Sequence, residues 1–317
     1  MKHFLLKLLL VIICFYGVLF LLQWIVDSGL RKTHNDDYAG WNLIFENQIK
    51  EPMVFLGSSR TEVHFDPQLI EKHTGIPCYN LGLSGTSLEF QKIRWRSYIA
   101  HSRPKIVIQN VDLFALSEKS LPDKRQFLPY YNKPEMFDEL KKVDPTTRLE
   151  KWIPMSKYRG FETLVLKGIA AFFGKEYTGT KIKGYRKHQQ SWNSDFEKFK
   201  KQLKGKPIDF STTDFSKGLA ELRQIITDCK KIDAQLILVW TPTYYELSEL
   251  QQPTLSTMNQ QISSMARENN VPLWDFTNDT INLDKKYFYN SFHMNDKGVA
   301  VFCRQFSDSL NVYLKKP

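Results

Sequence analysis

The 317-residue chain has few cysteines, no internal repeats and no low-complexity tracts. The absence of repeats and biased tracts argues against a solenoid or a disordered linker. Four cysteines without a CxxC pair or a ligand-like spacing to histidine exclude a disulfide scaffold and argue against a zinc site. We therefore expect buried free thiols and no metal. The cysteines are Cys14, Cys78, Cys229 and Cys303.

Charge is absent from Leu8 to Leu22, which read LLLVIICFYGVLFLL. With the apolar residues on either side, the run is about 23 residues or roughly 34 Å of helix, enough to cross a bilayer. No small-x-small cleavage site follows, so residues 1–30 are predicted to be an uncleaved anchor. Lys2 and Lys7 favour a cytoplasmic N-terminus and an extracytoplasmic remainder, on a bacterial cytoplasmic membrane. A buried core helix is the alternative, but such a helix rarely lacks a polar face.

The net charge of +10 is concentrated between Ser117 and Phe210, where 21 Lys or Arg face 12 Asp or Glu. A basic surface suits anionic lipid headgroups or an anionic envelope polymer, although it can also be a plain solvated face. No nucleic-acid motif accompanies the charge, so we expect no nucleic-acid partner. The aromatic residues among these lysines would suit sugar stacking. They are Trp152, Tyr158, Tyr185 and Trp192.

The rest of the chain alternates short apolar strands with longer amphipathic helices, which predicts an α/β fold. We expect a parallel sheet sandwiched by helices, with a core at 52–116 and 211–317 and an insertion at 117–210, together forming one domain at 31–317. The predicted strands are 52–59, 78–85, 105–112, 235–244 and 271–276. The predicted helices are 66–75, 87–102, 213–232, 255–270 and 295–314. Asp66 is expected to cap the first, and Thr213 or Asp214 is expected near the cap of the third.

Reactive side chains follow several of these strands, and ligands of parallel sheets collect outside the carboxyl ends of the strands. Serine needs a base to take its proton and donors to receive the oxyanion. Ser59, directly after the first strand, is the candidate nucleophile, and His293 is the candidate base. The N–H groups of Ser59 and Gly85 are candidate oxyanion donors, because glycine allows close approach of the backbone.

Three blocks of the sequence resemble the SGNH (GDSL-type) hydrolases, particularly their membrane-anchored DltD-like branch. The blocks are Gly57-Ser58-Ser59, the NLGLSG segment that ends at Gly85, and Asn290-Ser-Phe-His293-Met-Asn-Asp-Lys-Gly298. The resemblance covers about 52–112 and 235–314. It implies a flavodoxin-like three-layer fold with Ser59 as nucleophile and Gly85 in the oxyanion hole.

Two positions differ from the family pattern. The family's third block supplies an asparagine to the oxyanion hole, and here Asn110 is the candidate, with Asp112 bracing the loops nearby. Asn290 stands where the family has an aspartate, so it can accept a hydrogen bond from His293 but offers no charge. A backbone carbonyl, or Asp275, could orient the histidine instead.

Several neighbours have two interpretations. His64 either lines the pocket or flanks a helix at the surface, and Arg60 either binds an anionic group or pairs with an acid. Trp240, Tyr244 and Tyr245 follow a strand and either line a cleft or pack in the core.

The main hypothesis is a membrane-anchored O-acyl esterase or acyltransferase that acts on an envelope polysaccharide or similar polymer, without metal or organic cofactor. One alternative is a weakened or inactive scaffold that binds polymer or partners a membrane acyltransferase. Another is a lipid esterase with the same chemistry.

Overall fold

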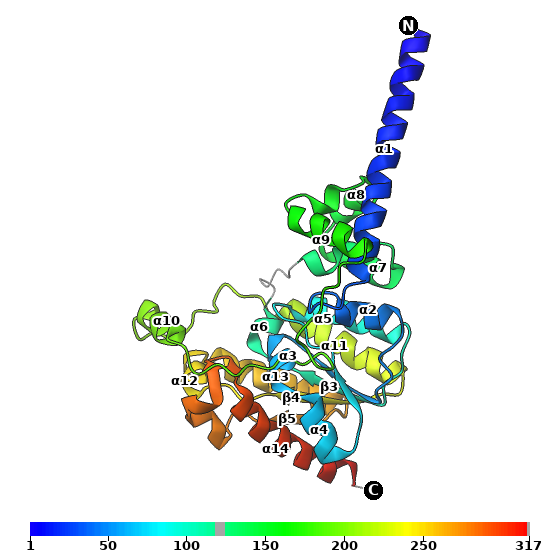
Figure 1. Cartoon of the computed structure of the whole chain (residues 1–317). Coiled ribbons are helices and arrows are strands. Elements are labelled where there is room, and N and C mark those ends of the chain that lie inside the picture. The colour runs from blue at the N-terminus through cyan, green and yellow to red at the C-terminus, as the bar shows by residue number, and fades with distance from the viewer. Residues whose placement is uncertain (118–123, 316–317) are drawn as a thin grey trace. The chain divides into compact units, whose positions relative to one another are not determined.

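The computed structural model describes residues 1–117 and 124–315, which form two compact units (Figure 1). The N-terminal unit comprises residues 1–48, 96–100 and 124–180, and the α/β unit comprises residues 49–95, 101–117 and 181–315. Residues 181–210 of the proposed insertion therefore lie in the α/β unit. The division into anchor, core and insertion stays a prediction.

The α/β unit is built on a five-stranded parallel sheet in the order β2-β1-β3-β4-β5. This is the flavodoxin-like order, with its switch point between β1 and β3. The fold class predicted from the sequence is confirmed. The strands are β1 (Met53–Leu56), β2 (Cys78–Asn80), β3 (Ile106–Asn110), β4 (Gln235–Trp240) and β5 (Leu273–Asp275).

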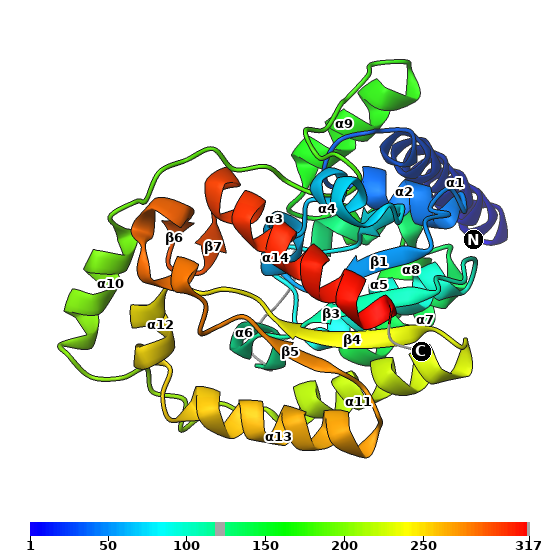
Figure 2. The same cartoon turned by 90° about the horizontal axis from the view of Figure 1, so that it is seen from below.

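Helices cover both faces of the sheet (Figure 2). Its α-helices are α3 (Ser59–His64), α4 (Pro67–Thr74), α5 (Leu88–Ile99, whose last residues belong to the N-terminal unit), α6 (Leu113–Leu116), α10 (Asp195–Leu203), α11 (Ser216–Lys231), α12 (Tyr245–Leu250), α13 (Thr254–Glu268) and α14 (Asp296–Leu314). Two 3-10 turns, η4 (Thr280–Leu283) and η5 (Lys285–Tyr287), precede a hairpin of β6 (Phe288–Asn290) and β7 (His293–Met294).

The sheet is buried because alternate residues of each strand face opposite layers. Phe55 and Ile108 point to the layer of α4 and α14, where they join Phe302 and Phe306 in one core cluster. Gln109, one residue along β3, points the other way and donates to Gln91 of α5 at 3.0 Å. The alternation puts continuous apolar strands between two helical layers.

Helix ends follow the predicted chemistry. Asp66 caps α4 by accepting the N–H of Gln68, and Gly75 ends the helix in the left-handed region. Helix α11 begins at Ser216 with Phe215 as its N-cap residue, and Asp214, predicted near the cap, accepts the Ser216 N–H from just outside. The short elements α3, α12, β6 and β7 were not predicted, because each is too brief to show a period.

The N-terminal unit is helical in its described residues. It comprises α1 (Lys2–Arg31), α2 (Ala39–Phe45), η1 (Lys124–Gln126), η2 (Leu128–Tyr130), α7 (Pro134–Val143), α8 (Thr147–Trp152), η3 (Ser156–Tyr158) and α9 (Glu162–Phe172). Among the described helices α1 alone is long and apolar enough to cross a membrane. A Cβ on Gly29 would lie 1.8 Å from the Gly168 carbonyl oxygen, so α1 and α9 touch along their backbones at a pair of glycines.

Replacement of Gly298 by alanine should destabilise the chain, although alanine normally favours a helix by about 1 kcal/mol. The new Cβ would lie 2.2 Å from the Tyr287 carbonyl oxygen, and such overpacking costs roughly 1–3 kcal/mol. The thermal unfolding midpoint of the full chain in mild detergent should fall in Gly298→Ala and stay unchanged in Ala300→Ser, an exposed position of the same helix. A midpoint at or above that of the wild type would contradict this account.

Candidate active site

Ser59 and His293, separated by 234 positions, meet at the carboxyl edge of the sheet. Ser59 is the first residue of α3, directly after β1, and its Oγ lies 2.9 Å from His293 Nε2. Gly57 makes the turn possible, since its φ is +156° and a Cβ there would lie 2.0 Å from the Thr61 hydroxyl oxygen. The geometry suits transfer of the serine proton to the imidazole.

Asn290 lies behind the histidine, and its side-chain oxygen accepts three N–H groups. The His293 Nδ1 is 3.0 Å from Asn290 Oδ1, and the backbone N–H groups of Phe292 and His293 donate to the same oxygen at 3.0 and 2.9 Å. The two backbone donors identify this atom as oxygen rather than amide nitrogen, and an oxygen can only accept from the ring. His293 therefore carries its proton on Nδ1, which leaves Nε2 free to accept from Ser59.

His64 is a second histidine of this edge, and it is fully buried. The N–H of Met294 donates to His64 Nε2 at 3.1 Å, so the proton of this ring lies on Nδ1, 3.0 Å from the Thr241 hydroxyl. Burial, with the charge of Arg60 second, lowers the pKa of His64 well below its usual value. His64 is neither at the surface nor in the pocket; it holds the strand that carries His293.

His293 is held neutral by its surroundings. Burial is the main cause that lowers its pKa, to about 3, and the positive charges of Arg60 and His188 add to the effect. The Tyr289 ring stacks on the imidazole at a centroid distance of 5.4 Å and 7° between planes. The His188 ring also stacks on Tyr289, at a centroid distance of 4.5 Å. A neutral imidazole is the form that can act as a base.

Ser59 and His293 line a cavity of about 280 Å³. Its lining comprises Ser58, Ser59, Arg60, Gly85, Asp112, Leu113, Phe114, Gln251, Phe292 and His293. Among the backbone hydrogen bonds of the described residues, neither the Ser59 N–H nor the Gly85 N–H donates to a carbonyl. Both residues line the cavity, so their N–H groups stay the candidate oxyanion donors.

The loop that carries Gly85 is fixed by a buried acid. Glu62 of α3 is fully buried and accepts the hydroxyl of Ser84, next to Gly85. Arg186, 3.2 Å away, and Lys181 neutralise its charge. Burial of a carboxylate requires such partners, so this cluster links α3 and the glycine loop to the segment around residue 186.

Asn110 and Asp112, the two candidates from the third block, differ in their relation to the cavity. Asn110 is fully buried, does not line the cavity, and neither its amide nitrogen nor its side-chain oxygen has a partner among the described residues. Asp112 lines the cavity, caps α6 through the Ala115 N–H at 2.7 Å and accepts the Ser58 hydroxyl at 2.7 Å. It thus accepts hydrogen bonds that brace the loops, as expected from its charge.

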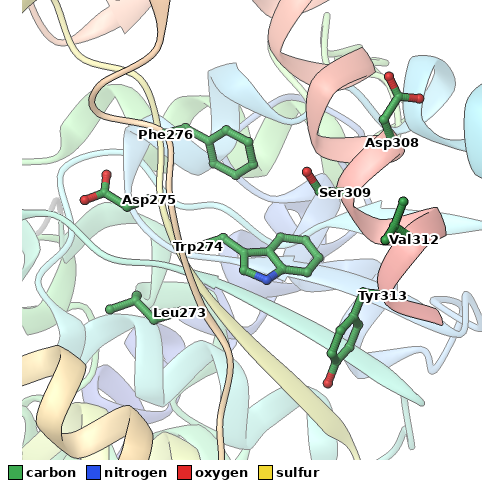
Figure 3. A pocket seen from close by; sticks show the side chains of 8 residues that line it. All are labelled: Leu273, Trp274, Asp275, Phe276, Asp308, Ser309, Val312 and Tyr313. Carbon is green, nitrogen blue, oxygen red and sulfur yellow. The ribbon is translucent and has the colours of Figure 1, made fainter. Parts of the chain in front are cut away.

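Asp275 lies away from His293. It accepts the Thr277 N–H and hydroxyl at the end of β5, and it lines a separate hollow of about 670 Å³ between β5 and α14 (Figure 3). Trp274, Phe276 and Tyr313 line the same hollow. Asn290, and neither Asp275 nor a backbone carbonyl, is therefore the group that meets Nδ1 of His293.

Arg60 is nine-tenths buried and donates to the carbonyl oxygens of Thr241 and Pro242 after β4, at 2.5 and 3.0 Å. It therefore positions the loop after β4 as well as lining the cavity. Trp240 and Tyr244 are core residues and, like the half-buried Tyr245, do not line the cavity.

The expected buried thiols are present at three positions, and Cys14 is exposed. Among the described residues, His, Cys, Asp and Glu side chains nowhere form a group of three that could hold a metal.

Sequence reasoning missed His64 as a positioning residue, and it missed Tyr289 and His188. His64 carries a local signal, since it ends the short helix that begins at Ser59. Tyr289 is next to Asn290 in the hairpin, but its stacking depends on the fold of that hairpin. His188 has no local signal, because only the tertiary path of the chain brings it to Tyr289.

No family model matches the chain, and a search of curated proteins found no match. Solved structures are similar at low identity. A protein designated an acylhydrolase from Bacteroides fragilis is 12% identical, with 87% of this chain and 97% of that chain covered and a TM-score of 0.45. A GDSL-like lipase from Bacteroides thetaiotaomicron is 13% identical, with 81% and 88% covered and a TM-score of 0.40.

A family two carbohydrate esterase from Clostridium thermocellum is 9% identical, with 83% of this chain and 64% of that chain covered and a TM-score of 0.41.

Stability should fall on acidification because His293 is neutral when folded and charged when unfolded. Between the ordinary pKa of 6.5 and the folded value of about 3, the unfolded chain binds the extra proton, so acid favours unfolding. The unfolding midpoint, followed from neutral pH to about pH 4, should fall less steeply in His293→Gln than in His73→Gln, an exposed control. Equal slopes would show that His293 is not the source.

Proposed function

We propose that this chain is a membrane-anchored serine esterase or O-acyltransferase of the SGNH type, acting on an acylated envelope polysaccharide or related polymer. The observation that carries the proposal is the chain of contacts from Ser59 Oγ to His293 Nε2, at 2.9 Å, and from His293 Nδ1 to Asn290 Oδ1, at 3.0 Å. A serine activated by a neighbouring base is the arrangement that acyl transfer requires.

The chemistry follows from the positions of these atoms. His293 Nε2 takes the Ser59 proton while Oγ attacks the acyl carbonyl, and the N–H groups of Ser59 and Gly85 receive the oxyanion. His293 then returns the proton to the leaving alcohol, which leaves an acyl group on Ser59. In the second half of the reaction, His293 takes a proton from water or an acceptor hydroxyl, whose oxygen attacks the acyl carbonyl. The proton then returns to Ser59 Oγ as the acyl group leaves.

The cavity favours a compact acyl group. Leu113, Phe114 and Phe292 supply apolar surface, and about 280 Å³ is at the small end of ligand pockets. Phe114 and Phe292 are 48% and 38% exposed, so they stand at the mouth, where a larger alcohol such as a sugar can meet them. The DltD-like branch, in which an anchor precedes the serine, is the part of the family that this arrangement fits best.

Asn290 favours a second candidate, a scaffold that binds polymer or partners a membrane acyltransferase. A neutral asparagine does not stabilise the imidazolium that forms during catalysis. The matching aspartate-to-asparagine change in a well-studied serine protease costs about 10⁴ in turnover. The low pKa of His293 also favours the scaffold, because it means that the charged imidazolium is disfavoured in this site.

A fluorophosphonate should label the wild-type chain at Ser59, because only a serine activated by a base attacks phosphorus readily. Labelling should disappear in Ser59→Ala and persist in Ser211→Ala, which changes an exposed serine. Gel fluorescence of the full chain in detergent measures both. Equal labelling of wild type and Ser59→Ala would reject the serine mechanism.

Asn290→Asp should raise esterase turnover by between tenfold and about 10⁴, because a carboxylate would accept the same three N–H groups and stabilise the imidazolium. The negative charge also raises the pKa of His293, so the acid limb of the pH–rate profile should move to higher pH. Asn278→Asp adds the same charge at an exposed position and should change neither quantity. Unchanged turnover with intact polymer binding would favour the scaffold.

A further inference from the structure

The N-terminal unit exposes large apolar side chains on residues 147–173, here named the collar. Their relative exposures are 67% for Leu149, 69% for Trp152, 51% for Ile153, 68% for Leu166 and 76% for Phe173. Scattered apolar residues are normal on a surface, but several such residues on one segment mark a contact with a partner or a membrane.

The collar is attached along the apolar helix α1, beside its C-terminal half (Figure 1). The Tyr16 hydroxyl donates to the Trp152 carbonyl, and the Met155 N–H donates to the Gln23 side chain at 2.7 Å. Further along, Lys157 forms an ion pair with Asp27 at 2.8 Å. The attachment therefore starts well inside the uncharged run of α1.

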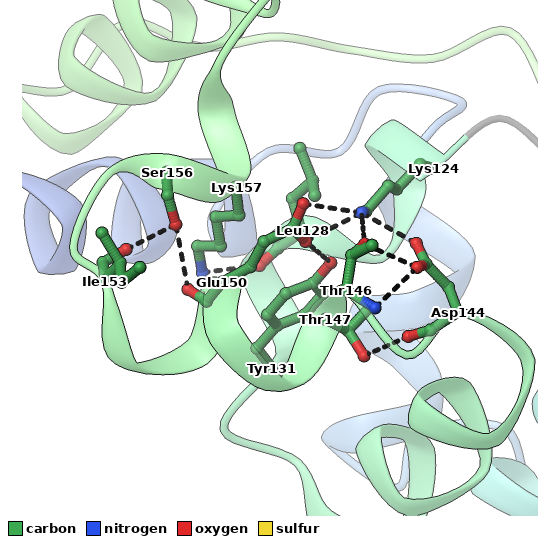
Figure 4. Close-up of polar contacts among 10 residues, drawn as sticks. All are labelled: Lys124, Leu128, Tyr131, Asp144, Thr146, Thr147, Glu150, Ile153, Ser156 and Lys157. Carbon is green, nitrogen blue, oxygen red and sulfur yellow. Dashed lines mark hydrogen bonds and ion pairs between the residues drawn. The ribbon is translucent and has the colours of Figure 1, made fainter.

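A polar network joins the collar to residues 124–146 (Figure 4). Glu150 accepts from Lys124 at 2.8 Å and from the Tyr131 hydroxyl at 2.9 Å. Lys124 also pairs with Asp144 at 2.9 Å, and Lys157 donates to the Leu128 carbonyl at 2.7 Å. The polar groups of this segment are thus satisfied by one another, while the apolar side chains are left exposed.

The attachment at Tyr16 fixes the depth of the collar. Tyr16 precedes Trp24, the aromatic residue near the end of the apolar run, by eight residues, about 12 Å of helix. A bilayer that covers Leu8 to Leu22 therefore also reaches Trp152. The contacts at Gln23 and Asp27 lie at and beyond the end of the run, so the collar extends from inside the apolar span to the headgroup–acyl boundary.

The charges of the segment suit the same environment. Between Thr147 and Tyr177 the chain carries six Lys or Arg against three Glu. Basic residues beside an inserted apolar face attract lipid phosphates, each by about 1 kcal/mol near an anionic surface. Trp24 of α1, 55% exposed, is an aromatic residue of the kind enriched at this boundary.

We propose that the collar is a lipid-binding surface that lies in the headgroup–acyl boundary of the bilayer that α1 crosses. The inference rests on the membrane anchoring in the proposed function and goes beyond it. On this proposal the N-terminal unit attaches to the membrane in two ways. Helix α1 crosses the bilayer, and the collar fixes how deeply α1 is inserted and how it is rotated about its own axis. Leu149, Trp152, Ile153, Leu166 and Phe173 are the residues that contact lipid.

A fluorescent probe on single positions tests this in full-length chain reconstituted into phosphatidylcholine–phosphatidylglycerol vesicles. The environment-sensitive dye NBD is attached to native Cys14, or, in a Cys14→Ala background, to Trp152→Cys, Phe173→Cys or the exposed control Gln202→Cys. The remaining three cysteines are buried, and burial raises the pKa of each thiol, so they react slowly.

Lipids that carry a nitroxide near the headgroup should quench the probes at 152 and 173, while aqueous iodide should quench the probe at 202. Nitroxides deep in the acyl chains should quench Cys14 and the probe at 152 more than the probe at 173, because Trp152 lies at the level of Tyr16 and the residue before Phe173 packs on Trp24. Quenching at 152 and 173 by iodide and not by lipid, with Cys14 still quenched by lipid, would overturn the collar and leave the anchor intact.

Two further results are decisive. Absence of lipid quenching at Cys14 as well would remove the anchoring part of the proposed function, and with it the basis of the collar. Shielding at 152 and 173 from both quenchers would mean that protein, in the form of a second copy, covers the surface instead of lipid, which also contradicts the proposal.

Discussion

The arrangement of Ser59 and His293 at the carboxyl edge of the sheet depends on one acceptor, the side-chain oxygen of Asn290. It receives the imidazole N–H and two backbone N–H groups within 3.0 Å, so one atom fixes both the turn between β6 and β7 and the orientation of the His293 ring. His64 also holds strand β7, because its Nε2 accepts the Met294 N–H. With the ring fixed in this way, Nε2 is directed at Ser59.

A neutral acceptor in that position sets the electrostatics of the site. Burial and the charge of Arg60 disfavour the imidazolium, while Asp112, the carboxylate that lines the cavity, is already engaged by Ser58 and Ala115. The histidine is thus oriented by hydrogen bonds to neutral groups, while the buried ion pairs of Glu62 hold the glycine loop. The lowered pKa keeps His293 neutral at physiological pH, the form that accepts a proton. It also raises the free energy of the imidazolium that forms during catalysis, so the same geometry is compatible with both proposed functions, a slow esterase and a binding scaffold.

In the N-terminal unit, a buried ion pair holds the helices together. The Asp27–Lys157 pair, with the Tyr158 hydroxyl 2.5 Å from Asp27, lies next to the glycine contact between α1 and α9. A charged pair inside an apolar packing is costly unless both partners are present, so it fixes one register of α1 against α9 and the collar. The polar contacts are satisfied inward, and the large apolar side chains are exposed.

Local pattern by itself determined the alternation of strands and helices, the apolar run of α1, the cap at Asp66 and the order of Ser59, Gly85 and His293 along the strand ends. These follow from periodicity and from residue chemistry within a few positions. Only the tertiary structure decided that Asn290 meets the histidine, that Asn110 is buried and does not line the cavity, and that His64 is a support rather than a surface residue. The Ser59–His293 and His64–Met294 contacts join residues 234 and 230 positions apart. Separations of that length are closed by the packing of β1, α3 and α14, which no local pattern encodes.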